Sequence, residues 1–245
     1  MFTIVENHNR HAHRDLIKRM YFLREEVFHN QLGWDVDSGP DGEIDIYDNN
    51  NPAYLIWCDE QRRTLYGSLR LLPTTGPTLL YDVFRSTFPN NVSLTAPGIW
   101  EGTRLCIDEA MVARDRPDID ARKAFCLMLL ALCETALDHG IHTMVSNYEP
   151  PTRRLYKMAG APLEELGRSD GFGRRPVCAG TFEVSEAVLS TMRKRLGVTE
   201  RLMESSAPAQ KTRSRAQPNT TPKSISSAFL NSGPGGERLG SLTAA

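Results

Sequence analysis

Residues 98–108, which read GIWEGTRLCID, constrain the fold most, because this stretch combines the composition of a strand with two opposite charges. β-Branched and aromatic residues of this kind are typical of strands. Side chains of a regular strand alternate between its two faces, so Glu101 and Arg104 would point to opposite sides of a sheet. An interior glycine often marks a β-bulge, which inserts one residue and shifts the phase of the residues after it. The sequence therefore predicts a bulge at Gly102 or Thr103 that brings Glu101 and Arg104 to one face.

Helical and extended patterns alternate around this strand. Apolar residues at helical spacing predict a helix over 14–29, and an almost uniformly apolar segment before Gly140 predicts a buried helix over 121–139. The remaining expected elements are strands at 53–58 and 64–72, a strand at 141–147, a helix at 151–159, a strand at 176–184 and a polar helix near 186–204. This order predicts a three-layer α/β/α sandwich on a mixed, mostly antiparallel sheet with a bulged central strand, as in acetyltransferase-like folds.

Length and composition set the domain organisation. The 245 residues suffice for one good-sized domain with a tail. We expect a folded domain over 1–200 and, where Ser, Pro and Gly dominate, a disordered tail over 205–245. The 29 basic and 30 acidic residues give a net charge of −1, which argues against a protein that coats nucleic acid.

Cysteine usage and apolar runs indicate the compartment. The five cysteines form no C-x-x-C pair, so buried thiols in a reducing compartment are expected rather than disulfides or a zinc site. The N-terminus has no basic segment followed by an apolar core, and the longest apolar run, 124–133, is too short to cross a bilayer. The sequence predicts a cytoplasmic protein without a membrane span or a metal.

Charged side chains inside apolar strands, together with an acidic loop, are the candidate functional groups. The loop over 30–51 carries Trp34, Asp45 and Asp48, and long ordered loops are often functional. Arg70 lies among leucines in a predicted strand, where it needs either solvent or a carboxylate partner. Two interpretations stay open for Asp45, Arg70, Glu101 and Arg104: a structural ion-pair network on the sheet, or a binding and catalytic site.

Several patches, taken in order, resemble the acyl-homoserine-lactone synthases, the autoinducer synthases of bacterial quorum sensing. The resemblance covers about 1–185 and rests on their order and spacing. The patches read LREEVF from residue 23, GW from 33, EIDIYD from 43, GSLRLLPT from 67, LYDVF from 80 and WEGTR from 100. The positions that define the family are all matched, by Arg24, Phe28, Trp34, Asp45, Asp48, Arg70, Phe84, Glu101 and Arg104. The chain departs from the family at Leu105, where an aromatic residue is frequent, and at Thr103, where serine is common.

The resemblance implies a two-substrate acyltransferase whose catalytic domain is residues 1–200. Such an enzyme joins the amine of S-adenosylmethionine to a fatty acyl group from an acyl carrier protein, then closes a lactone and releases methylthioadenosine. S-adenosylmethionine is a substrate here, and no cofactor is expected. Glu101 and Arg104 would be the catalytic residues, Glu101 as general base. The substrate-binding residues would be Arg24, Phe28, Trp34, Asp45, Asp48, Arg70, Phe84, Thr103 and Thr143.

The residue types suit these substrates. Carboxylates such as Asp45 and Asp48 attract a cationic ligand, and the rings of Phe28 and Trp34 offer faces to a sulfonium or an adenine. Arg24 or Arg104 would hold the substrate carboxylate with a forked donor. Backbone N–H groups freed by the bulge would stabilise the oxyanion.

Two further expectations concern the acyl donor. Thr143 resembles a family position at which a hydroxyl favours 3-oxo-acyl chains. A carrier protein is acidic, so its docking surface should be basic, and the candidates are Arg153, Arg154 and Lys157 with Arg168, Arg174 and Arg175 nearby in sequence.

Two rival interpretations remain. An acyl-coenzyme A-dependent N-acyltransferase of the same fold needs a glycine-rich phosphate loop before the central helix. Residues 114–122 contain no glycine and three aspartates, which weighs against such a loop without excluding coenzyme A as donor. A non-enzymatic regulator on the same fold is disfavoured by the intact Glu101 and Arg104.

Overall fold

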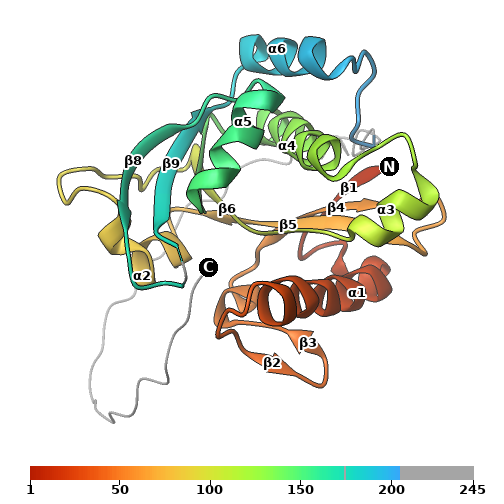
Figure 1. Ribbon diagram of the computed structural model, residues 1–245, viewed down its shortest axis with the longest axis horizontal. Helices are drawn as coiled ribbons and strands as arrows, with labels where there is room; N and C mark the ends of the chain where they lie inside the picture. The colour runs from red at the N-terminus through yellow and green to blue at the C-terminus, as the bar shows by residue number, and fades with distance from the viewer. Residues whose placement is uncertain (174, 205–245) are drawn as a thin grey trace, which may run out of the picture. The chain divides into compact units, whose positions relative to one another are not determined.

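The computed structural model describes residues 1–173 and 175–204 (Figure 1). The predicted disordered tail at 205–245 and Arg174 lie outside the described residues. No helix in the described part is long and apolar enough to span a membrane.

A seven-stranded sheet forms the middle layer. In spatial order its strands are β1 (Phe2–Val5), β4 (Ala53–Cys58), β5 (Leu65–Pro73), β6 (Ile99–Ile107), β7 (Thr143–Tyr148), β9 (Val177–Glu183) and β8 (Glu164–Ser169). All neighbours are antiparallel except β6 and β7, which are parallel. A separate hairpin pairs β2 (Ser38–Gly39) with β3 (Gly42–Glu43). The mixed, mostly antiparallel sheet confirms the predicted fold.

Helices cover both faces of this sheet (Figure 1). One face carries α3 (Glu109–Asp115), α4 (Ala121–Asp138), α5 (Arg153–Ala159) and α6 (Glu186–Leu196); the other carries α1 (Arg14–Arg24) and α2 (Leu79–Asp82). Successive side chains of a strand point to opposite faces of the sheet. Leu55 of β4 packs into the core with α4, whereas Tyr54 and Ile56 pack against α1. The central helix α4 is buried along nearly its whole middle, as predicted.

Short helical segments complete the chain. Four are 3₁₀ turns: η1 (Arg10–His13), η3 (Ile46–Asn49), η4 (Arg85–Thr87) and η5 (Pro150–Thr152). The helix predicted to end at residue 29 is α-helical only to Arg24 and continues as a π-helix, η2 (Glu25–Gln31). π-Helical turns are rare and frequently occur at functional sites.

Among the elements that were not predicted are β1, β8 and α3. β1 has only four residues, β8 (EELGRS) carries charges and a glycine instead of an apolar alternation, and α3 (EAMVARD) lies in a polar stretch. β1 and β8 are the two edge strands, which are defined by backbone pairing with β4 and β9. Such pairing with a distant strand leaves little local pattern in the sequence.

The bulge in β6 exists, but the predicted position was wrong. Gly102 and Thr103 pair regularly with Leu71 and Arg70, and the register shifts between this pair and Ser68 opposite Cys106. The extra residue therefore lies in the Arg104–Leu105 step, and Arg104 has a left-handed φ of 54°. A non-glycine residue in this region costs free energy, which the contacts of the Arg104 side chain offset.

The consequence predicted for the bulge is confirmed. Arg104 reaches Glu43 beside α1, and Glu101 contacts the start of α2, so both side chains lie on the same face of the sheet. The bulge also ends the pairing of β6 with β7, whose last pair is Gly102 with Ser146. Beyond this pair the two strands separate and leave room for a cavity.

Candidate active site

Six charged side chains form a buried network on the α1 face of the sheet. Three are arginines from α1, β5 and β6, and three are carboxylates from the segment that follows β2: Arg24, Arg70, Arg104, Glu43, Asp45 and Asp48. All but Asp45, which keeps 12% side-chain exposure, are almost completely buried.

Arg24 binds two of the carboxylates. Its Nη1 and Nη2 donate to the two oxygens of Asp48 at 2.8 and 3.0 Å, and its Nε donates to Glu43. The Tyr54 hydroxyl donates a further bond to Asp48 at 2.7 Å. Burial alone would raise the pKa of Asp48, but the charges of Arg24 and Arg70 hold it well below its usual range.

Arg70 and Arg104 close the network around Asp45. Arg70 donates to the two oxygens of Asp45 at 2.5 and 2.9 Å and, through Nε, to the Thr103 hydroxyl at 3.1 Å. Arg104 donates to Glu43 at 3.0 Å and to Asp45 at 3.3 Å. Three positive and three negative charges therefore balance, and the ion-pair network expected of Asp45, Arg70 and Arg104 is present.

Glu43 is a network residue that we did not predict. The preceding Gly42 has a φ of 93°, and a Cβ there would lie 2.5 Å from the backbone carbon of Tyr21. Only glycine allows β3 to approach α1 so closely, and this approach brings Glu43 to Arg24. The signal in the sequence was the glycine before the EIDIYD patch.

Glu101 lies outside this ion-pair network. Its two carboxylate oxygens accept hydrogen bonds from the backbone N–H groups of Leu79 and Leu80, at 3.1 and 2.7 Å, at the start of α2. The side chain is completely buried. Burial raises the pKa of Glu101 to about 7, although Arg70 and the two N–H groups oppose this shift.

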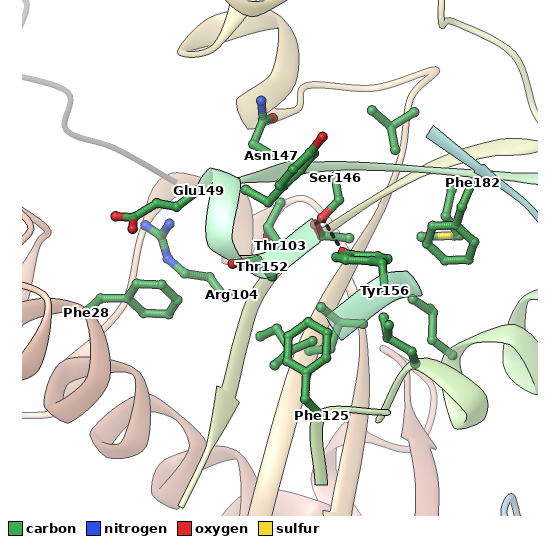
Figure 2. Close-up of a pocket in the computed structure, with 18 of the residues that line it drawn as sticks. Phe28, Thr103, Arg104, Phe125, Ser146, Asn147, Glu149, Thr152, Tyr156 and Phe182 are labelled. Atoms are coloured by element: carbon green, nitrogen blue, oxygen red, sulfur yellow. Dashed lines mark hydrogen bonds between the residues drawn. The ribbon is translucent and has the colours of Figure 1, made fainter. Parts of the chain in front are cut away.

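A cavity of about 220 Å³ opens where β6 and β7 separate (Figure 2). Phe28, Arg104 and Glu149 lie towards one end, and Phe125, Tyr156 and Phe182 lie towards the other. The first end carries the charges of Arg104 and Glu149, and the labelled side chains at the second end are uncharged aromatic rings from α4, α5 and β9 (Figure 2).

The cavity brings together some of the predicted site residues but not all. Four line it: Phe28, Trp34, Thr103 and Arg104. The π-helix η2 places the Phe28 ring 5.1 Å from the Trp34 ring and 5.0 Å from the Arg104 guanidinium carbon. Six others do not line the cavity and lie in the ion-pair network or against α2: Arg24, Asp45, Asp48, Arg70, Phe84 and Glu101.

Thr143 is also absent from the cavity wall. It begins β7, where its hydroxyl lies 2.9 Å from Nδ1 of His142. One β7 residue that lines the cavity with a hydroxyl is Ser146, which donates to the Gly102 carbonyl at 3.2 Å and accepts from Tyr156 at 3.1 Å.

Several of the basic residues predicted to dock a carrier protein already form ion pairs within the chain. Arg153 and Arg168 both pair with Glu165, and Arg175 pairs with Glu149. Arg154 and Lys157 stay exposed on α5, and the described part of the chain gives neither side chain an ion pair.

The comparisons with known proteins agree with this arrangement. The splayed, bulged sheet with a cavity at its centre belongs to the acetyltransferase-like α/β folds. A family model described as autoinducer synthase matches residues 7–212, and the chain belongs to this family. The family's curated relatives are named acyl-homoserine-lactone synthases, and the chain is an acyltransferase of that kind.

Individual relatives cover most of the chain. It is 34% identical over 201 residues to the acyl-homoserine-lactone synthase of Rhizobium etli, covering 80% of this chain and 88% of the relative. It is 29% identical to the isovaleryl-homoserine lactone synthase of Bradyrhizobium diazoefficiens, covering 78% and 83%. The solved coenzyme A-dependent synthase BjaI, with S-adenosylmethionine and isopentyl-coenzyme A, shares the fold with a TM-score of 0.72 at 24% identity, covering 83% and 92%.

Proposed function

We propose that this chain acylates the amine of S-adenosylmethionine with a fatty acyl group from an acyl carrier protein and then forms the homoserine lactone. The amine nitrogen attacks the thioester carbonyl, and the carrier thiolate leaves with the proton that the amine loses. The substrate carboxylate then attacks the carbon next to the sulfonium, and methylthioadenosine leaves as a neutral thioether. The two-ended cavity carries this proposal, because one end suits an acyl chain and the other a charged, aromatic substrate.

The cavity suggests a division of roles. Arg104 is the arginine that lines the cavity among the described residues, so it would hold the substrate carboxylate, while Arg24 does not line the cavity and binds Asp48 and Glu43. Phe28 and Trp34 would pack against the adenosyl group. The network of Asp45, Asp48 and Arg70 would position Arg104 and Thr103 rather than touch the substrate. Glu101 would be the general base, through rearrangement of its bonds when substrates bind.

The donor is proposed to be a carrier protein rather than free coenzyme A. The N-terminus of α4 is capped by Asp120, whose carboxylate accepts from the Lys123 N–H at 2.7 Å. A negative charge at this position repels a pyrophosphate, which would otherwise use those N–H groups.

The donor's pantetheine arm, common to a carrier protein and coenzyme A, offers amide groups. Asn147 Oδ1 and Tyr148 Oη are buried and have no hydrogen-bond partner among the residues described. Both residues line the cavity, and an amide placed there would satisfy these atoms.

Product analysis tests the function. Purified protein is mixed with S-adenosylmethionine and either acyl carrier protein thioester or acyl-coenzyme A, and lactone and methylthioadenosine are measured by mass spectrometry. We expect both products in equal amounts with the carrier protein and much slower turnover with coenzyme A. Faster turnover with coenzyme A would identify it as the donor, and no lactone with either would contradict the function.

Substitution of Ser146 by alanine should weaken any preference for 3-oxo-acyl donors over unsubstituted ones by about tenfold. The Ser146 hydroxyl, with its partner Tyr156, can bond an oxygen on the acyl chain, and one lost hydrogen bond has about this effect on selectivity. The ratio of kcat/KM for the two donors is the measurement. Thr143→Ala is the control, and a change confined to this control would restore the original prediction for Thr143.

Charge reversal at Arg154 should raise the KM for the carrier protein several-fold and leave the KM for S-adenosylmethionine unchanged. Arg154 is exposed on α5, and complementary charge chiefly accelerates docking of an acidic partner. Steady-state kinetics at low and high salt measure the effect, which salt should diminish. Arg122→Glu, an exposed charge on α4, is the matched control. Equal changes in the two KM values for Arg154→Glu would argue against docking.

A further inference from the structure

A cationic substrate needs a carboxylate partner. The four carboxylates in or beside the ion-pair network already accept hydrogen bonds from other groups of the protein. Glu43, Asp45 and Asp48 each accept from arginines, and both oxygens of Glu101 accept backbone N–H groups. Binding a cation to any of them would leave a buried guanidinium or amide without its partner. This is strongly unfavourable, so the positive charge of the substrate must be met elsewhere.

Glu149 is the acidic residue that lines the cavity in the part of the chain that the structure describes, and Arg104 is the basic one. The two come from neighbouring strands, since Arg104 lies at the bulge of β6 and Glu149 directly follows β7. Both lie towards the charged end of the cavity, with Phe28 (Figure 2). One positive and one negative group at one end complement a substrate that carries both charges.

The existing partner of Glu149 does not prevent this role. Glu149 pairs with Arg175 at 3.1 Å, and the two side chains are 26% and 59% exposed. Ion pairs this exposed contribute little stability, so the carboxylate can exchange partners at small cost. Pro150 and Pro151 follow Glu149 and restrict the backbone that presents its side chain.

We propose that the Glu149 carboxylate binds the sulfonium of S-adenosylmethionine, which makes it a substrate-recognition residue beyond those of the matched motifs. This inference rests on the proposed function for the identity of the substrate. The sulfonium fits better than the amine, because a carboxylate beside the amine would hold its proton and impair its attack on the thioester. The charge lost when methylthioadenosine leaves would also weaken product binding, which favours release.

Calorimetric binding without acyl donor tests the proposal. Glu149→Gln should raise the Kd for S-adenosylmethionine about tenfold, the size expected for losing one charged contact. The Kd for S-adenosylhomocysteine, which has the same amino-acid part but a neutral sulfur, should change less than twofold. An unchanged Kd for S-adenosylmethionine would overturn the proposal. An equal loss for both ligands would assign Glu149 to the amino-acid part instead and overturn it as well.

Two control variants separate recognition from a structural role. Glu165→Gln removes a carboxylate that pairs with Arg153 and Arg168 outside the cavity and should leave both Kd values unchanged. Arg175→Gln removes the competing cation and should bind S-adenosylmethionine at least as tightly as the wild type. A loss like that of Glu149→Gln would mean that Glu149 only holds Arg175, against the proposal. Because binding is measured without donor, a wild type that binds S-adenosylmethionine but forms no lactone contradicts the function and not this site.

Discussion

Glu101→Gln should lower kcat for lactone formation about 100-fold or more, because general-base catalysis contributes on this scale. The amide is isosteric but cannot accept the amine proton. In the wild type the rate should rise with pH through about 7, because burial raises the pKa of Glu101 to about 7 and the base acts only when deprotonated. The variant should lose this limb of the pH profile. Steady-state kinetics over pH, with product detection, measure both effects.

The contacts of Glu101 also predict what a purely structural role would look like. Its oxygens hold the first N–H groups of α2, so an anchor without catalytic function would show itself in stability. The thermal unfolding temperature would fall, while the activity of the folded fraction and its pH profile would stay those of the wild type. Thr78→Ala, beside the same turn, provides a control whose hydroxyl makes no hydrogen bond in the described structure.

Arg24→Met should destabilise the protein by about 3–5 kcal/mol at neutral pH, because it leaves buried carboxylates without their partner. Arg24 is fully buried and binds Asp48 with both Nη atoms and Glu43 with Nε. Methionine fills similar volume, so the loss measures charge compensation rather than a cavity. Urea unfolding measures the change. Arg14→Met, an exposed position on the same helix, should shift stability by less than about 0.5 kcal/mol.

The pH dependence of this loss has a definite sign. The pKa values of Glu43 and Asp48 are lowered in the folded protein by the arginines, after burial has raised them. Their stabilising contribution is therefore present above their ordinary pKa, about 4, and is lost as pH falls through the folded values. In Arg24→Met the buried carboxylates of Glu43 and Asp48 lower the free energy of unfolding only when they are ionised. The difference between variant and wild type should shrink towards acid pH, and a difference independent of pH would contradict the ion-pair interpretation.

Only part of the site could be predicted from the chain. The motif around Glu101 and Arg104 predicted a bulge and a shared face, because strand alternation and an interior glycine are local rules. The position of the bulge depends on a left-handed Arg104 whose side chain is held by Glu43, 61 residues away in sequence. A contact at this separation leaves no periodic pattern, so the predicted position was one or two residues too early.

The sequence by itself determined the family, the main helices and strands, and the residue types of the site, because these follow from local composition, periodicity and motif spacing. Only the tertiary structure decided which of these residues line the cavity. The charges of the ion-pair network, among them Arg24, Asp45, Asp48 and Arg70, neutralise one another, and these four residues do not line the cavity. Ser146 and Glu149 do line it. The physical reason is that burial and pairing of charges depend on the packing of α1 and β3 against β6, which no short segment encodes.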